Sequence, residues 1–336
     1  MIVETERAIM DRLVHVYKGA PPDICVCDQA LRRLPNGEWA IFFMTGGETE
    51  PRKENYVAVC RSKDRGATWS KKETVLRFED HACTLTEVLV RGQEIQIMVN
   101  IHLGFFEDWR NLVLVSQDAG RTWDVPVPFA PLPRRGFIRN FCVSTWGEWF
   151  LPFQTYDTMP DPAPSPLHDG SHKFARNGVF ISGHEGRTWT RSNDIGPVAG
   201  WAENNIVELR DGRMVMFIRE DYGRGCIMRS ESGDRGRTWS PPAPTDIPNP
   251  GSKFRLHRLR SGRIILIHNP NSRVRNPLAL WASDDDMKTW PHKRVLADFP
   301  GALQYPDGFV DEDEGYVHFA FDYNRHDLIY VGAKLP

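Results

Sequence analysis

Short apolar segments, separated by turns rich in glycine and asparagine, recur along the chain. Residues 38–44 read Glu-Trp-Ala-Ile-Phe-Phe-Met, residues 213–219 read Arg-Met-Val-Met-Phe-Ile-Arg, and residues 263–268 read Arg-Ile-Ile-Leu-Ile-His. Each follows a turn signal such as the Asn-Gly pair at 36–37, and Asn-Gly between apolar segments strongly favours a β-hairpin. The pattern therefore predicts an all-β protein built from short strands.

An eight-residue motif, Ser-x-Asp-x-Gly-x-Thr-Trp, punctuates these strands. His184 replaces the aspartate in the third copy, and Met287 replaces the glycine in the fifth. Neighbouring copies start 50 to 66 residues apart, a spacing typical of repeat architectures. The five copies begin at Ser62, Ser116, Ser182, Ser232 and Ser283.

The chemistry of this motif suits a tight turn. The carboxylate can accept hydrogen bonds from backbone N–H groups, the glycine tolerates positive φ, and the tryptophan buries a large ring. The motif resembles the Asp-box, or BNR, motif. In proteins that carry it, it joins the two outer strands of a β-propeller blade, away from the ligand-binding face. The resemblance implies a propeller and a structural role for these aspartates.

The strand pattern divides the chain into six units, which predicts one six-bladed propeller domain over residues 1–336. The last unit, from residue 305 to 334, lacks a box, and we expect residues 12–17 to supply its outer strand and close the ring. A Pro-rich insertion at 156–176 is expected at the rim of a binding site. First strands are predicted to begin near Asp28, Ala82, Asn140, Glu203, Lys253 and Tyr305.

Composition narrows the possible functions. Hydrophobic residues make up 40% and charged residues 26%, which excludes a disordered chain. Lysine plus arginine number 42 against 44 acids, so no nucleic-acid partner is indicated. No apolar run reaches membrane-span length and the first residues do not resemble a signal peptide, so we expect a cytoplasmic protein without a membrane partner. The oligomeric state stays open.

Cysteine use indicates no metal site. The six cysteines are few for this length, and most lie in strand-like contexts, which favours buried free thiols. Cys25 and Cys27 are too close for a usual zinc pair, and no second pair exists. We therefore predict neither a metal nor another cofactor.

Three further stretches resemble the sialidase superfamily. Residues 203–219 are similar to the segment that carries the glutamate partner of the nucleophile and the second arginine of a carboxylate clamp, here Glu203 and Arg219. Arg275 stands where the third arginine is expected, and the segment around Tyr305 resembles the one with the tyrosine nucleophile. The resemblance implies an exo-acting glycoside hydrolase whose substrate is an acidic sugar.

The chain departs from that family in its first blade. Cys27 stands at the position of the first arginine, and no aspartate matches the frame of the acid/base residue. Glu48, Glu50 and Glu54 are nearby acids, and Glu48 is taken as a substrate-binding candidate. Arg139 and Arg325 are expected at the rim of the central funnel, as further substrate-binding candidates.

Two alternatives remain at this point. His81 and His102 flank neighbouring strand ends, and a pair of imidazoles could serve a uronate lyase, with His or Tyr abstracting the C5 proton. A propeller can also be a non-catalytic glycan-binding or scaffold disc. Trp201 and the Phe105–Phe106 pair could stack on a sugar or could simply be packing residues.

Overall fold

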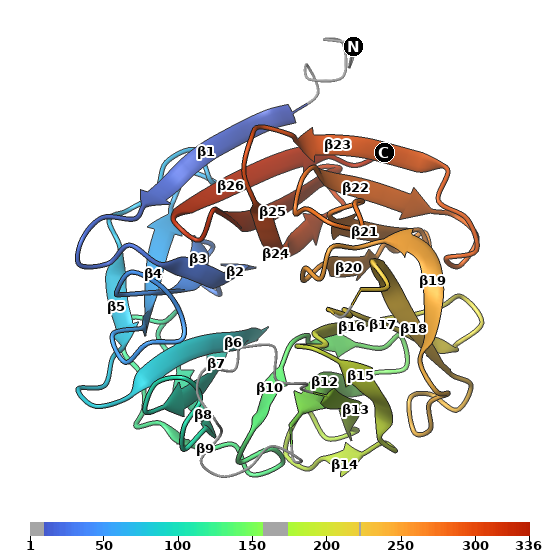
Figure 1. Cartoon of the computed structure of the whole chain (residues 1–336), viewed down its shortest axis with the longest axis horizontal. Coiled ribbons are helices and arrows are strands. Elements are labelled where there is room, and N and C mark those ends of the chain that lie inside the picture. The colour runs from blue at the N-terminus through green and yellow to red at the C-terminus, as the bar shows by residue number, and fades with distance from the viewer. Residues whose placement is uncertain (1–9, 157–173, 222) are drawn as a thin grey trace.

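The computed structural model describes residues 10–156, 174–221 and 223–336, and these form six β-sheets around a central axis (Figure 1). The described part contains no helix, and therefore none that could cross a membrane. Each sheet is one blade, with its first strand nearest the axis. The prediction of an all-β, six-bladed propeller is confirmed.

The first three blades follow one another along the chain. Blade 1 has β2 (Val26–Arg33), β3 (Trp39–Thr45), β4 (Tyr56–Ser62) and β5 (Glu73–Leu76). Blade 2 has β6 (Ala82–Arg91), β7 (Glu94–His102), β8 (Arg110–Ser116) and β9 (Val127–Pro128). Blade 3 has β10 (Gly136–Ile138), β11 (Cys142–Val143), β12 (Trp149–Thr155), β13 (Phe174–Ser182), β14 (Thr190–Arg191) and β15 (Ile195–Ala199).

The remaining blades complete the ring. Blade 4 has β16 (Asn204–Glu208), β17 (Met214–Ile218), β18 (Cys226–Ser232) and β19 (Ala243–Pro248). Blade 5 has β20 (Arg255–Arg258), β21 (Ile264–His268), β22 (Leu278–Ser283) and β23 (His292–Ala297). Blade 6 has β24 (Leu303–Asp311), β25 (Tyr316–Tyr323) and β26 (Asp327–Lys334), and the N-terminal strand β1 (Met10–Lys18) pairs antiparallel with β26.

The inner strand of blade 3 differs from the expected single strand beginning near Asn140. It begins at Gly136 and is interrupted between Ile138 and Cys142, so β10 and β11 pair separately with β12. The interruption faces Pro152, which has no N–H to donate to the ladder. Residues 157–173 of the predicted insertion lie outside the described residues.

The fourth Asp box shows how these turns are held. Asp234 accepts hydrogen bonds from the backbone N–H of Thr238 at 2.8 Å and from its hydroxyl at 2.6 Å. The Ser232 hydroxyl accepts the Gly236 N–H at 2.8 Å, and Gly236 has φ +84°. In the fifth box Met287 takes the same place at φ +65°, and its buried side chain joins the core.

Tryptophans of the boxes join neighbouring blades. Trp123 of blade 2 lies 6.1 Å from Phe42 of blade 1, between ring centroids. Trp69 of blade 1 lies 5.5 Å from Tyr330 of blade 6. Each of these indole rings therefore buries its apolar area against the preceding blade, and this contact holds neighbouring blades together.

We expect Asp234→Ala to lower the free energy of unfolding by ~1 kcal/mol, because it removes the bonds that hold the turn. His184→Ala is the matched control: His184 contacts Thr188 through a single side-chain pair at 3.0 Å, so its loss should matter less. Urea unfolding at neutral pH measures both, and equal effects would contradict the role assigned to the carboxylate.

The stability that Asp234 gives to this turn should fall in acid. Burial opposes ionisation of Asp234, but the Thr238 hydrogen bonds outweigh it and hold its pKa at about 2. Since this lies below the unfolded value of roughly 4, the contribution of Asp234 is present above that pH and is lost as the pH falls through about 2.

Four charged side chains from inner strands meet near the central axis. Arg32 of β2 pairs with Glu87 of β6 and with Asp307 of β24. Arg255 of β20 lies 3.0 Å from Asp307 and 3.6 Å from Glu87. These four largely buried groups, which we call the axial ion ring, alternate in sign and link four of the six blades.

Candidate active site

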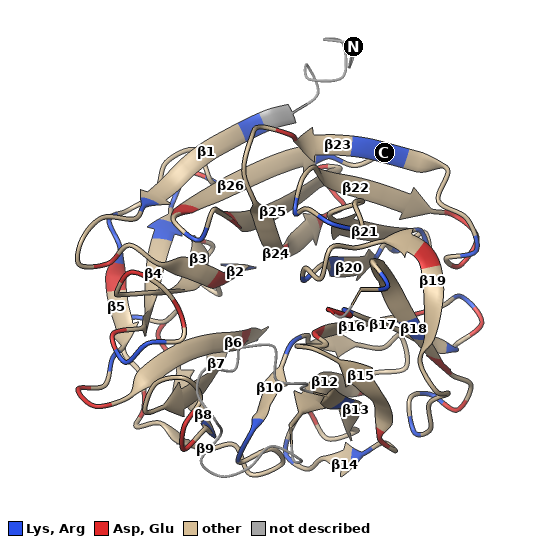
Figure 2. Cartoon of the chain, viewed as in Figure 1, with Lys and Arg blue, Asp and Glu red and all other residues tan. Residues whose placement is uncertain are grey.

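A cavity of about 150 Å³ lies where the inner strands begin. All six blades contribute to its wall, and charged residues of both signs are distributed around the ring (Figure 2). The lining residues are Asp28, Glu50, Pro51, Thr84, Phe106, Phe137, Arg139, Trp201, Glu203, Arg219, Arg275, Tyr305 and Arg325.

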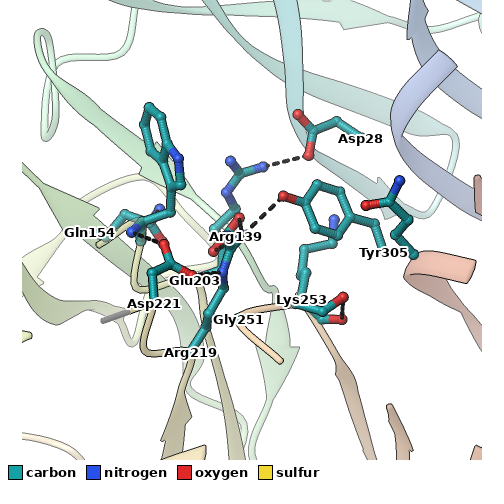
Figure 3. A network of polar contacts seen from close by, with 12 residues as sticks. Asp28, Arg139, Gln154, Glu203, Arg219, Asp221, Gly251, Lys253 and Tyr305 are labelled. Carbon is teal, nitrogen blue, oxygen red and sulfur yellow. Dashed lines mark hydrogen bonds and ion pairs between the residues drawn. The ribbon is translucent and has the colours of Figure 1, made fainter. Parts of the chain in front are cut away.

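Tyr305 points its hydroxyl into this cavity from a distorted part of β24 (Figure 3). The pairing of β24 with β25 is irregular between Gln304 and Asp307, and Tyr305 has φ +59°. Bulges and left-handed residues of this kind re-aim side chains and are enriched at functional sites. The Gln29 amide donates to the Tyr305 carbonyl and supports this backbone.

Glu203 and Arg219 stand together beside the Tyr305 hydroxyl (Figure 3). Arg219 Nη1 lies 2.9 Å from both carboxylate oxygens of Glu203 and 2.9 Å from Tyr305 Oη. Burial opposes the charge on Glu203, but Arg219 and then Arg139 outweigh it and hold its pKa below the usual value. Asp221 binds Arg219 Nε at 2.5 Å from the outer side.

A second ion pair faces Tyr305 across the cavity. Arg139 Nη1 donates to Asp28 Oδ1 at 3.0 Å, and both side chains are about 95% buried. Asp28 has φ +48° and lies within a bulge of β2, much as Tyr305 lies in the irregular part of β24 with a positive φ. The Arg139 guanidinium also lies 4.0 Å from the Phe137 ring centroid, so it is fixed on two sides.

Arg275 differs from the other lining arginines because its hydrogen-bond partners among the described residues are neutral. Its guanidinium donates to Gln304 Oε1 and to the Gly251 carbonyl, at 2.8 Å for the latter. Among the described residues no carboxylate lies within ion-pair distance of it. Burial, together with the nearby cations Arg219 and Arg325, lowers the pKa of Arg275, although Tyr305 opposes this.

Arg325 reaches the cavity from the turn between β25 and β26. Its guanidinium lies 4.4 Å from the Tyr305 ring centroid and 2.8 Å from Glu50 Oε1. The buried Cys27 thiol donates to Glu50 Oε2 at 3.2 Å, and burial raises its pKa well above the usual value. Arg219, Arg275 and Arg325 thus surround the Tyr305 ring, and Arg325 comes from blade 6, whereas position 27 in blade 1 is a cysteine.

Three other predicted residues lie away from this arrangement. Glu48 is exposed and does not line the cavity; Glu50, two residues later, takes that place. His102 is buried, accepts the Gly104 N–H at 3.1 Å and packs on Phe106, and burial lowers its pKa to about 3. His81 contacts Asp80 and Arg110 outside the lining. His81 directly precedes Ala82, which pairs with His102 between β6 and β7. Neither histidine lines the cavity.

Aromatic side chains form one wall. Phe106, Phe137 and Trp201 line the cavity, with Phe106 and Trp201 5.2 Å apart. Phe105, also predicted as a stacking platform, instead lies under the Arg52 guanidinium at 4.4 Å. The Tyr156 hydroxyl donates to the Trp201 carbonyl and fixes the loop that carries this tryptophan.

Sequence reasoning missed Asp28 and Lys253. Asp28 lies near the start of an inner strand, as Glu203 and Tyr305 do, so its place in the repeat was a usable signal. Lys253 lies 5.6 Å from the Tyr305 ring centroid and adds a cation near the phenol. Cys27, Asp28 and Glu50 are close enough together to hold a metal ion, but Arg139 and Arg325 already bind the two carboxylates.

Comparison with known proteins identifies the family of the chain. Residues 40–319 match the model of the BNR repeat-like domain. A sialidase of Micromonospora viridifaciens is 29% identical over 151 residues, which cover 40% of this chain and 23% of that protein. The chain thus matches about a quarter of that relative's length.

Solved structures share the fold at low identity. A Hadza microbial sialidase aligns over 93% of this chain and 66% of its own, with a TM-score of 0.76 and 18% identity. A Dyadobacter fermentans protein of unknown function aligns over 97% and 98%, with a TM-score of 0.74 and 17% identity. A leech intramolecular trans-sialidase aligns over 96% and 70%, with a TM-score of 0.73 and 13% identity. The chain belongs to the BNR repeat-like domain family and is a sialidase-like six-bladed propeller.

Proposed function

We propose that this protein is a glycoside hydrolase that removes a terminal acidic sugar, with Tyr305 as the nucleophile and Glu203 as its base. One observation carries the proposal: the Tyr305 hydroxyl and the Glu203 carboxylate share one nitrogen of Arg219 in a cavity lined by further arginines. A phenol, a carboxylate and a cation so placed can pass a proton and stabilise a phenolate.

The charges of the lining favour a ligand with one negative charge. Four arginines and three carboxylates line the cavity. Three of these arginines have a carboxylate partner, namely Asp28, Glu50 or Glu203, and only Arg275 among the lining arginines does not. A carboxylate on the ligand would supply the missing charge, and a guanidinium can bind it through two parallel hydrogen bonds.

The proposed reaction has two steps. Tyr305 Oη attacks the anomeric carbon, its proton passes to Glu203, and the bond to the leaving oxygen breaks. Water then attacks the same carbon, Tyr305 leaves and recovers its proton from Glu203. Two displacements retain the anomeric configuration. A neutral phenol suits a sugar whose carboxylate adjoins the reacting carbon, because a carboxylate nucleophile would be repelled.

A matched pair of substrates tests this function. The chain is assayed with an aryl α-sialoside and with its methyl ester, which differs only in lacking the charge. We expect hydrolysis of the acid with retained configuration by NMR, and a kcat/KM lower by ~10²-fold or more for the ester. Equal rates would contradict recognition through Arg275.

The competing functions give different products. A uronate lyase would form a C4–C5 double bond that absorbs in the ultraviolet, and we expect no such absorbance from uronate polymers. Failure to turn over either sialic acid or uronate substrates would favour a binding disc over an enzyme.

A further inference from the structure

The reaction proposed above needs one more proton carrier, because an alkoxide is a poor leaving group. Three carboxylates line the cavity, and two of them are held by buried arginines. Glu203 is bound through both oxygens to Arg219 beside the nucleophile. Asp28 is held by Arg139 in a pair that is about 95% buried on both sides, so it cannot easily change partner.

Glu50 is the lining carboxylate whose partner is itself available to a ligand. Its side chain is 21% exposed and that of Arg325 is 26% exposed, whereas Arg219 and Arg139 are about 95% buried. Arg325 also lies against the Tyr305 ring, where the sugar would sit. The other bond to Glu50 comes from the Cys27 thiol, a neutral donor. An incoming carboxylate can therefore compete for Arg325.

We propose that Glu50 is the general acid–base of this site. We also propose that the substrate's carboxylate binds Arg325, breaks the Arg325–Glu50 ion pair and so allows Glu50 to take up a proton. This rests on the proposed function. Once Arg325 turns to the substrate, Glu50 loses an opposite charge, gains a like charge nearby and is covered by the sugar. Each of these changes favours the protonated carboxylic acid. The proton comes from solvent as the substrate binds.

Proton transfer balances over the two steps. The Glu50 proton moves to the leaving oxygen as the bond from that oxygen to the anomeric carbon breaks and the Tyr305 bond forms. In the second step the Glu50 carboxylate removes a proton from water as the water oxygen attacks and Tyr305 leaves. Glu50 is then protonated again, and it returns that proton to solvent when the product departs and Arg325 re-forms its ion pair.

Other titratable groups face Glu50 and must be separated from it. Cys27 and Asp28 of β2 lie close to it, and Asp322 of β25 interacts electrostatically with Glu50, Arg275 and Arg325. Burial raises the pKa of Asp322 to about 7, against the effect of Arg325, so a proton on Asp322 must be distinguished from one on Glu50. Within the part of the chain that the structure describes, the buried Oδ2 of Asp322 has no hydrogen-bond partner. Asp322→Asn and Asp28→Asn are therefore the rival variants.

The first experiment compares leaving groups. Glu50→Gln should lower kcat/KM on an alkyl sialoside by ~10²- to 10⁴-fold, and by less than ~10-fold on an aryl sialoside whose leaving group needs no proton. The basic limb of the pH profile should disappear in this variant. A similar loss on both substrates, or a leaving-group dependence that appears in Asp28→Asn or Asp322→Asn and not in Glu50→Gln, would overturn the assignment.

The second experiment measures proton uptake. Calorimetric titration of the wild-type chain with an unreactive unsaturated sialic acid, in buffers of different ionisation enthalpy, should show net proton uptake on binding. Glu50→Gln should lose most of it, and Asp322→Asn should keep it. Binding without uptake in the wild type would overturn the inference alone, whereas absence of both binding and turnover would overturn the proposed function with it.

Discussion

Tyr305→Phe is expected to lower kcat on an aryl α-sialoside by ~10³-fold or more, because it deletes the oxygen that forms the covalent intermediate. The folded state should change little. The variant loses one hydrogen bond from Arg219, worth ~1 kcal/mol, while the ring stays among the same neighbours. Arg219 keeps Glu203 and Asp221 as partners, so no buried charge is left unpaired.

The measurement pairs steady-state kinetics with thermal unfolding. Tyr17→Phe is the matched control, since its hydroxyl donates to the Asp23 carbonyl at 2.7 Å on the outer strand of blade 6. It removes the same atom far from the cavity and should leave kcat unchanged. A Tyr305→Phe protein that retains kcat within ~10-fold of wild type would contradict the nucleophile assignment, since loss of a covalent catalyst costs far more.

Asp307→Ala is expected to destabilise the protein by ~3–5 kcal/mol, because it breaks the axial ion ring and leaves buried cations short of a counter-charge. Asp307 pairs with Arg32 and Arg255, and its side chain is 4% exposed. Burial opposes its ionisation, but Arg255 and Arg32 outweigh this and lower its pKa. Its contribution is therefore present at neutral pH and is lost as the pH falls into the acidic range.

Chemical denaturation at neutral pH and at lower pH tests this expectation. Asp313→Asn is the control, since Asp313 pairs with Arg260 on the surface with both side chains largely exposed, and it should not change the unfolding midpoint. If the two variants unfolded alike, the axial ion ring would contribute no more than a surface pair. The difference between wild type and Asp307→Ala should also shrink as the pH falls.

The blades could be predicted from sequence because their signals are local. An Asp box closes its turn with groups a few residues apart, as Asp234 does with Thr238. Strand alternation and Asn-Gly turns act over similarly short distances. Glu203, Arg219 and Tyr305 were found because their places in the repeat matched a known arrangement, and the structure brings these three into contact.

The rest of the site depends on contacts between distant blades. Arg325 reaches Glu50 across the junction of the last blade and the first, and no local pattern indicates that it covers the region of Cys27. The loop before residue 55 decides that Glu50, and not Glu48, faces the cavity. The burial of His102 beside Phe106 is likewise a property of packing, which no local pattern indicates.

The pairing of β1 with β26 affects how the chain folds during its synthesis. Met10 lies opposite Ala333, so the first strand of this propeller to be synthesised waits for its last strand before it finds its partner. Until then β1 has no place in a sheet, and its exposed edge can pair with other nascent chains. Blade 6 should therefore be the last part to become protected from hydrogen exchange after synthesis, and the stage at which aggregation most readily begins.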